Sequence, residues 1–157
     1  MTKEEIKNLI VATQEKWASM ILERGRAYKE KENLDDLVSE LLHDVYAFNH
    51  CDVLFKPTLA KHKQFRSTKE EFISYFLGQN KICEEDSGFA IKNWKSIKFE
   101  NYKIVEHNDN FLSMGNYFFQ SVDGRDVVKV EFTFGYVKDK DNNLLIKLHH
   151  SSIPYTN

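Results

Sequence analysis

The chain has few residues that interrupt secondary structure or cross-link it. It contains two prolines, six glycines and two cysteines in 157 residues. So little proline and glycine argues against a collagen-like or low-complexity chain, and two cysteines without CxxC spacing argue against a disulfide scaffold. We therefore expect Cys51 and Cys83 to be reduced and structural, because an unpaired cysteine usually behaves as a small buried hydrophobe.

Long apolar runs and an excess of charge are also lacking. No uninterrupted apolar segment approaches the length of a signal peptide or membrane span, so we expect a cytoplasmic protein without a membrane partner. The 22 Lys and Arg residues nearly balance 24 Asp and Glu residues, which gives a net charge of −2. Without a basic surface we expect no nucleic-acid partner. The length fits one globular domain over residues 1–157.

The first half of the chain predicts three helices. Apolar residues at helical spacing predict a long amphipathic helix over about residues 3–28, an extension at the start of the domain, and a shorter one over 34–42. A third is expected before Gly78. The expected capping residues are Thr2 with Glu5, then Asn33, then Ser67 or Thr68 with Glu70 or Glu71. The short apolar stretch 53–55 stops at Pro57, which cannot donate to a sheet.

The second half predicts a sheet. From Ile91 onward, the chain has extended segments rich in aromatic and β-branched residues. Turn residues at 107–110, 123–124 and 139–143 separate these segments. This pattern favours four antiparallel strands in a meander. The chain is therefore expected to be an α+β domain, in which three helices on one face of a curved sheet leave a conical cavity.

The closing segment 148–152, with the sequence LHHSS, concentrates polar groups on the last predicted strand. Side chains of a strand alternate between faces, so Lys147, His149 and Ser151 should share one face, and Ile146, Leu148, His150 and Ser152 the other. His149 and Ser151 are then placed to bind one small anion through an imidazole and a hydroxyl. The alternative is a polar strand end whose hydroxyls satisfy backbone groups.

Other familiar chemistry is not indicated. The sequence has no nucleophile elbow, Walker loop, Rossmann glycine pattern, HExxH or EF-hand loop. Adjacent histidines on opposite faces do not form a metal pair, although a zinc site assembled from distant residues stays open. By position alone, Thr58 is a turn residue and Tyr75 a core aromatic.

Several motifs together resemble the iota-class carbonic anhydrases. They are DVLFKPT (52–58), SYF (74–76), MGNYFF (114–119), VEFTFGY (130–136) and LHHSSIP (148–154). These enzymes belong to the calcium/calmodulin-dependent kinase II association-domain-like family, within the nuclear-transport-factor-2-like (NTF2-like) fold. The resemblance covers about residues 34–155. The family's ending often has three histidines, and Leu148 occupies the first of those places here.

The resemblance implies a cone-shaped NTF2-like fold with a strongly curved antiparallel sheet, a homodimer or higher homo-oligomer, and reversible hydration of carbon dioxide to bicarbonate. It implies no cofactor, with a divalent metal as the alternative. The implied catalytic and substrate-binding residues are Thr58, Tyr75, His149 and Ser151. Phe55 and Phe76, with strand aromatics such as Phe132 or Phe134, would form an apolar wall for carbon dioxide.

A hypothetical mechanism follows from those residues. Thr58, Tyr75 and Ser151 would orient a water and the developing carbonate oxygens, and His149 would accept the proton directly or through a hydroxyl. The rival interpretations are a non-catalytic ligand-binding or oligomerisation module, and an isomerase or cyclase with an acidic base. Glu131 and Asp126 are acidic residues on the predicted sheet, and we expect both to be surface residues or cross-strand partners.

Overall fold

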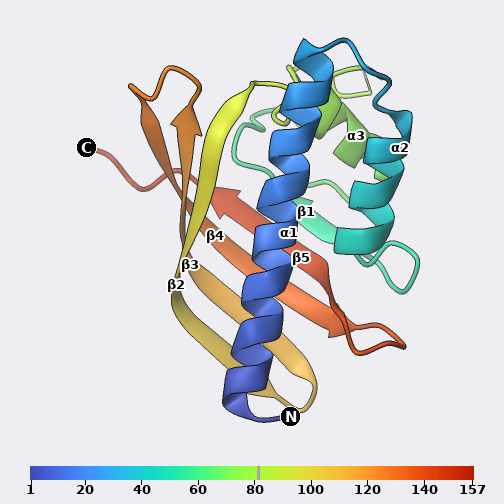
Figure 1. Cartoon of the computed structure of the whole chain (residues 1–157), viewed down its shortest axis with the longest axis vertical. Coiled ribbons are helices and arrows are strands. Elements are labelled where there is room, and N and C mark those ends of the chain that lie inside the picture. The colour runs from blue at the N-terminus through green and yellow to red at the C-terminus, as the bar shows by residue number, and fades with distance from the viewer. Residues whose placement is uncertain (81) are drawn as a thin grey trace.

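The computed structural model describes residues 1–80 and 82–157, and it has the expected mixture of helices and sheet (Figure 1). The helical elements are α1 (Lys3–Lys29), α2 (Asp35–Glu40), the π-helical turn η1 (Leu41–Val45) and α3 (Lys69–Leu77). The strands are β1 (Leu54–Lys56), β2 (Trp94–His107), β3 (Asn110–Ser121), β4 (Val127–Lys138) and β5 (Leu144–Ser152). The order in the sheet is β1-β5-β4-β3-β2.

Strands β2 to β5 form the expected antiparallel meander, but the sheet has one strand more than expected. The short apolar stretch before Pro57 is β1, which pairs with β5 in parallel and places Phe55 beside His149. This pairing joins segments almost a hundred residues apart. The start of the loop after β1 is thereby held next to the end of β5.

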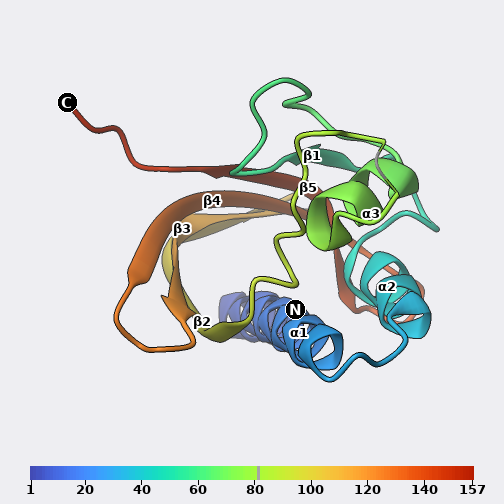
Figure 2. The ribbon, with the colours of Figure 1, turned by 90° about the horizontal axis from the view of Figure 1, so that it is seen from above.

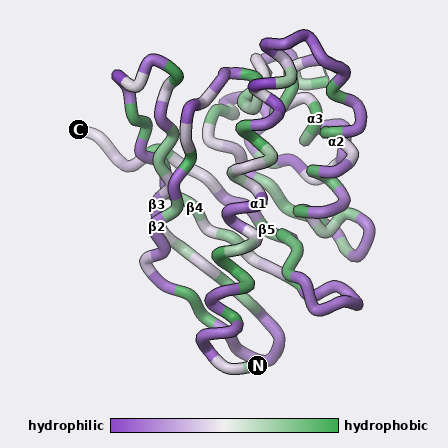
Figure 3. The backbone as a smooth tube through the Cα atoms, viewed as in Figure 1, coloured by the Kyte–Doolittle hydropathy of each residue, from purple (hydrophilic) through white to green (hydrophobic). Residues whose placement is uncertain are grey.

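Helix α1 begins as the sequence predicts, with a capping box between Thr2 and Glu5. Hydrophobic residues recur along its length (Figure 3), and its buried face packs on β2. Trp17, near the middle of the helix, is completely buried in the main core. The helix expected as an extension therefore supplies part of the core.

The second helix differs from the prediction at its start, where Leu34 and not Asn33 is the N-cap residue, and in its second half. It starts at Asp35, whose backbone N–H donates to the Asn33 side chain at 2.9 Å, and it is α-helical only as far as Glu40. One turn of π-helix follows, and the chain leaves it at Tyr46 in an extended conformation. A π turn takes up more residues than an α turn, so it changes which side chains face inward. Val45 and Tyr46 are both fully buried.

Helix α3 is capped as predicted, by Thr68 with Glu71 at its start and by Gly78 at its end. Gly78 has a φ of 67°, a left-handed conformation that glycine adopts without steric cost.

The sheet curves around α1 (Figure 2), and an irregularity in β2 contributes to that curvature. The pairing of β2 with β3 shifts register between Asn101 and Lys103, opposite Gly115. A Cβ atom at Gly115 would lie 2.0 Å from the Glu100 carbonyl oxygen, so only glycine fits there. Such a β-bulge bends a strand and increases its twist. The concave face holds the core.

A second register shift corrects the predicted facing of β5. Leu148 pairs with Gly135 and Ile146 with Tyr136, so Lys147 is an extra residue without a partner on β4. The side chains of β5 therefore alternate in one phase before Lys147 and in the opposite phase after it. Ile146 is fully buried, so the expectation that it shares one face with Leu148 and the exposed His150 is wrong. His149 and Ser151 are both buried, while His150 is exposed.

Cys83 is buried and Cys51 is exposed, and neither forms a disulfide. We expected both cysteines to be buried structural residues. This is wrong for Cys51, which follows an exposed turn after Phe48. None of the described helices combines the length and the hydropathy needed to cross a membrane.

Candidate active site

The buried end of β5 contributes to a small internal cavity that contains the expected site residues. The space open to the centre of a water molecule is about 10 Å³, which is room for about one ordered water. The lining residues are Trp17, Phe55, Thr58, Tyr75, Phe76, Phe89, Tyr117, His149 and Ser151. Two larger hollows, of about 280 and 500 Å³, lie against α1 and contain none of the expected residues.

Three hydroxyl groups meet at this cavity. The Thr58 and Ser151 hydroxyl oxygens are 2.5 Å apart, and the Tyr117 hydroxyl also bonds that of Ser151. A fourth hydroxyl, on Tyr75, accepts a hydrogen bond from the Leu59 backbone N–H at 3.4 Å. The groups come from the loop after β1, from α3, and from β3 and β5. The cluster therefore exists only in the folded chain.

The His149 imidazole lies beside this cluster and bonds two tyrosines. Its Nδ1 is 2.8 Å from the Tyr46 hydroxyl, and its Nε2 is 3.1 Å from the Tyr117 hydroxyl. The indole N–H of Trp17 donates to Tyr46 at 2.9 Å. The imidazole and the Phe134 ring are nearly perpendicular, at 82°, with ring centroids 4.4 Å apart. Both ring nitrogens are thus engaged within an aromatic environment.

Burial favours the neutral forms of the titratable groups of the cavity. It lowers the pKa of His149 well below its usual value, because a desolvated imidazolium is unfavourable. Burial also raises the pKa of Tyr46, Tyr75 and Tyr117, against partial opposition from hydrogen bonds. A cation also lies close to Ser151: the Lys56 ammonium donates to the Ser151 backbone carbonyl at 3.0 Å.

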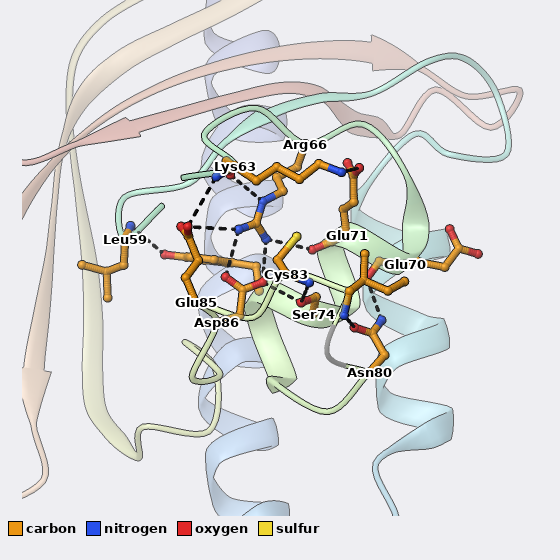
Figure 4. A network of polar contacts seen from close by, with 12 residues as sticks. Leu59, Lys63, Arg66, Glu70, Glu71, Ser74, Asn80, Cys83, Glu85 and Asp86 are labelled. Atoms are coloured by element: carbon orange, nitrogen blue, oxygen red, sulfur yellow. Dashed lines mark hydrogen bonds and ion pairs between the residues drawn. The ribbon is translucent and has the colours of Figure 1, made fainter. Parts of the chain in front are cut away.

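A buried ion pair holds the loop that carries Thr58 (Figure 4). The Arg66 guanidinium donates two hydrogen bonds to the Asp86 carboxylate, at 2.7 and 2.9 Å, and it lies 5.8 Å from the centre of the Tyr75 ring. The neighbouring Glu85 carboxylate accepts from three consecutive backbone N–H groups of the loop, at positions 61–63. This network ties the loop to α3, which carries Tyr75.

The structure thus brings the predicted residues Thr58, Tyr75, His149 and Ser151 around one cavity, with Phe55 and Phe76 in its wall. Of the two suggested strand aromatics, Phe134 contacts the His149 ring. The two acidic residues considered as a possible base lie at the surface, as expected. Asp126 and Glu131 are exposed, and the Glu131 carboxylate accepts a cross-strand hydrogen bond from Ser152.

Sequence reasoning missed Trp17, Tyr46 and Tyr117. Tyr117 lies within the MGNYFF motif and could have been found by following the alternation of β3, which places it on the inward face. Trp17 and Tyr46 belong to none of the motifs, and no local signal marks them. In the described part of the chain, no three His, Cys, Asp or Glu side chains lie together as a set of metal ligands.

Comparison with known proteins identifies the family. A family model described as "Metal-independent carbonic anhydrase" matches residues 8–153. The chain belongs to this family. A metal-independent carbonic anhydrase from Nostoc sp. is 32% identical over 149 residues, which cover 93% of this chain and 72% of the relative.

Solved structures agree with this assignment. The crystal structure of a cyanobacterial iota-carbonic anhydrase complexed with bicarbonate superimposes with a TM-score of 0.89 and 29% identity, covering 100% of this chain and 94% of that one. An NTF2-like protein from Shewanella oneidensis, of unknown function, matches with a TM-score of 0.55 and 16% identity, covering 97% and 99%. The second match shows the shared NTF2-like fold alone.

As a member of the metal-independent carbonic anhydrase family, the protein is an enzyme that reversibly hydrates carbon dioxide to bicarbonate and needs no metal cofactor. The expected fold, activity and independence of a metal are therefore confirmed. Leu148, at the place where the family's ending often has a histidine, pairs with Gly135. It is not among the residues that line the cavity.

Proposed function

We propose that carbon dioxide hydration takes place in the cavity at the end of β5. Its catalytic and substrate-binding residues are Thr58, Tyr75, His149 and Ser151, and Tyr117 is a fifth. The observation that carries this proposal is the convergence of hydroxyl groups at Ser151, where Thr58 and Tyr117 both form hydrogen bonds. Hydroxyls can donate to carbonate oxygens and accept from water. A related enzyme with 29% identity was crystallised with bicarbonate, which supports the same ligand here.

A chain of neutral hydroxyls suits hydration without a cation. Water has a pKa of about 15.7, so free hydroxide is costly to form when no metal lowers that value. A hydroxyl of Thr58 or Ser151 can accept a proton from the attacking water while it donates its own to a carbon dioxide oxygen. One carbon–oxygen bond forms, one water O–H bond breaks, and the product is carbonic acid. That acid then loses a proton to solvent and becomes bicarbonate.

The aromatic side of the cavity supports the same assignment. The rings of Phe55 and Phe76 are stacked with centroids 5.6 Å apart, and Phe89 stacks on Tyr75 at 5.7 Å. Such a wall favours nonpolar carbon dioxide over water. Bicarbonate has four heavy atoms and needs more room than one water, so we expect the Thr58 and Ser151 hydroxyls to separate and bond its oxygens instead.

Stopped-flow measurement of carbon dioxide hydration tests the proposal. We expect catalysis above the buffer rate, unchanged after treatment with a strong chelator. Thr58→Ala, Tyr75→Phe and Ser151→Ala should each lower kcat/KM by about 10- to 1,000-fold, since each removes a hydrogen-bonding group from the transition state.

The matched control is Ser113→Ala. Ser113 is a buried serine of β3 whose hydroxyl bonds Tyr136 instead, at 2.8 Å. Full activity of the Ser151→Ala variant, or a fall in the Ser113→Ala variant as large as in Ser151→Ala, would refute the site. Loss of activity on chelation would refute its cation-free chemistry.

We further propose that residues 1–157 form one domain and that two copies pair as a cytoplasmic homodimer. Exposed apolar residues support pairing through the outer face of the sheet: Leu112 and Met114 of β3 are 42% and 54% exposed. Two unpaired cysteines suit a reducing compartment. Sedimentation equilibrium should give twice the mass of one chain, and Met114→Lys should reduce that mass to one chain. Subcellular fractionation tests the location.

A further inference from the structure

The hydrogen bonds around His149 begin at a group that can only donate. The indole of Trp17 has one N–H and no acceptor, and it donates to the Tyr46 hydroxyl at 2.9 Å. Both side chains are buried, with 1% and 0% of their surfaces exposed. One lone pair of the Tyr46 oxygen is therefore permanently occupied by a donor that cannot be reversed.

The direction of the next hydrogen bond follows from the single proton of Tyr46. Among the described residues, the groups bonded to the Tyr46 hydroxyl are Trp17 and the Nδ1 of His149, at 2.8 Å. Trp17 cannot accept that proton, so His149 must. The opposite direction would leave the Tyr46 proton buried without an acceptor, which is unfavourable because a buried donor loses its hydrogen bond to water without replacing it.

We propose that Trp17 and Tyr46 are positioning residues that hold His149 as the tautomer with its proton on Nε2, so that His149 donates to Tyr117 and is not the base that accepts the proton of the attacking water. The inference rests on the proposed function of the Ser151 cavity. The Nε2 nitrogen is 3.1 Å from the Tyr117 hydroxyl, a suitable distance for a donated hydrogen bond.

This tautomer gives the whole chain of hydrogen bonds one direction. Tyr117 accepts from His149, so its own proton is free to point to the Ser151 hydroxyl, and Ser151 in turn can donate to Thr58 or to a ligand. Donors that follow one another in a chain strengthen each other by polarisation. The chain therefore presents O–H groups to the cavity, which is the polarity that the oxygens of bicarbonate require.

The same arrangement removes His149 as a proton acceptor. With Nδ1 bonded to the Tyr46 proton and Nε2 already protonated, another proton would create a buried imidazolium between Phe55 and Phe134, at centroid distances of 4.7 and 4.4 Å. The sequence-based hypothesis made His149 the acceptor. The hydrogen-bond pattern instead assigns it a fixed orientation.

Nitrogen NMR of the protein labelled with ¹⁵N-histidine tests the tautomer directly. His149 resonances are assigned by comparison with His149→Gln. We expect a protonated Nε2 and an unprotonated Nδ1 without change from about pH 6 to 9. The titratable groups that face or adjoin the ring are Tyr46, Tyr117 and the neighbouring His150. A protonated Nδ1, or an imidazolium near neutral pH, would overturn the inference.

Two tyrosine variants separate positioning from a general loss of packing. Tyr46→Phe should remove the preference, so that both tautomers of His149 are populated, and should lower kcat/KM about 10-fold. The control is Tyr136→Phe, which removes another buried hydroxyl of the same core, bonded to Ser113 and Gln14. The control should leave both the tautomer and kcat/KM unchanged. Equal effects in the two variants would contradict the inference.

Trp17→Phe provides a second test if Tyr46→Phe folds poorly. It removes the donor that fixes the direction, so a mixture of His149 tautomers is expected, and a spectrum identical to that of the unmodified protein would contradict the inference. The tautomer can be measured without turnover. A protein that failed to hydrate carbon dioxide would refute the proposed function, while its NMR spectrum would still decide the orientation of His149.

Discussion

The hydroxyl oxygens of Thr58 and Ser151 lie 2.5 Å apart although 93 residues separate them in the chain. The parallel pairing of β1 with β5 brings them together, and Pro57 ends β1 just before Thr58. Their contact makes the two residues act as one unit.

A double-mutant cycle should reveal this coupling. Thr58→Ala and Ser151→Ala are each expected to lower kcat/KM about 100-fold, and the double variant should be little worse than either, because the residues serve the same bonds. Stopped-flow hydration assays measure all four proteins. Multiplicative losses, about 10,000-fold in the double variant, would show that the two hydroxyls act independently.

Burial of His149 should make stability depend on pH. The folded-state pKa is lowered, so between the unfolded value of about 6.5 and the folded value only the unfolded chain binds this proton. Stability contributed by the neutral imidazole is therefore present above about pH 6.5 and decreases as the pH falls, by about 1.4 kcal/mol per unit. Urea unfolding at several pH values measures the slope. His149→Gln should lose this part of the slope, and an unchanged slope would contradict the assignment.

The ion pair between Arg66 and Asp86 should be important for stability and for the site. Both side chains are almost completely buried, and removing one partner of a buried pair typically costs about 3–5 kcal/mol. Asp86→Asn should thus lower the free energy of unfolding by about 3 kcal/mol and reduce activity by loosening the loop with Thr58. The exposed pair of Arg26 with Glu32 is the control, and Glu32→Gln should change stability by less than about 1 kcal/mol. Similar small changes in both variants would contradict this role.

Arg24 should be replaceable with a gain in stability. Its side chain is 1% exposed, and among the described residues its Nε and Nη2 atoms have no hydrogen-bond partner. Burial lowers the pKa of its guanidinium to about 10. Arg24→Met keeps most of the side-chain volume next to apolar residues such as Leu42 and Phe76, and should raise the free energy of unfolding by about 1–3 kcal/mol. If urea unfolding gave a lower free energy of unfolding for Arg24→Met than for the unmodified protein, the Arg24 guanidinium would have a stabilising partner in solution.

Local patterns were sufficient for much of the fold. The capping pairs of α1 and α3 and the turn residues between strands were predicted from sequence because each depends on residues a few positions apart. The π turn before Tyr46 and the extra residue Lys147 in β5 were not, because nothing in the local sequence marks them.

Strand alternation in the sequence was enough to predict an α+β chain whose closing strand turns His149 and Ser151 to one face, and the sequence motifs indicated the family and the partners Thr58 and Tyr75. The folded arrangement was needed to show that Trp17 and Tyr46 form hydrogen bonds in series to His149 and that Tyr117 links His149 to Ser151. The reason is physical: hydrogen bonds join whichever groups the fold buries together, and the direction of a proton depends on every neighbour that can accept it.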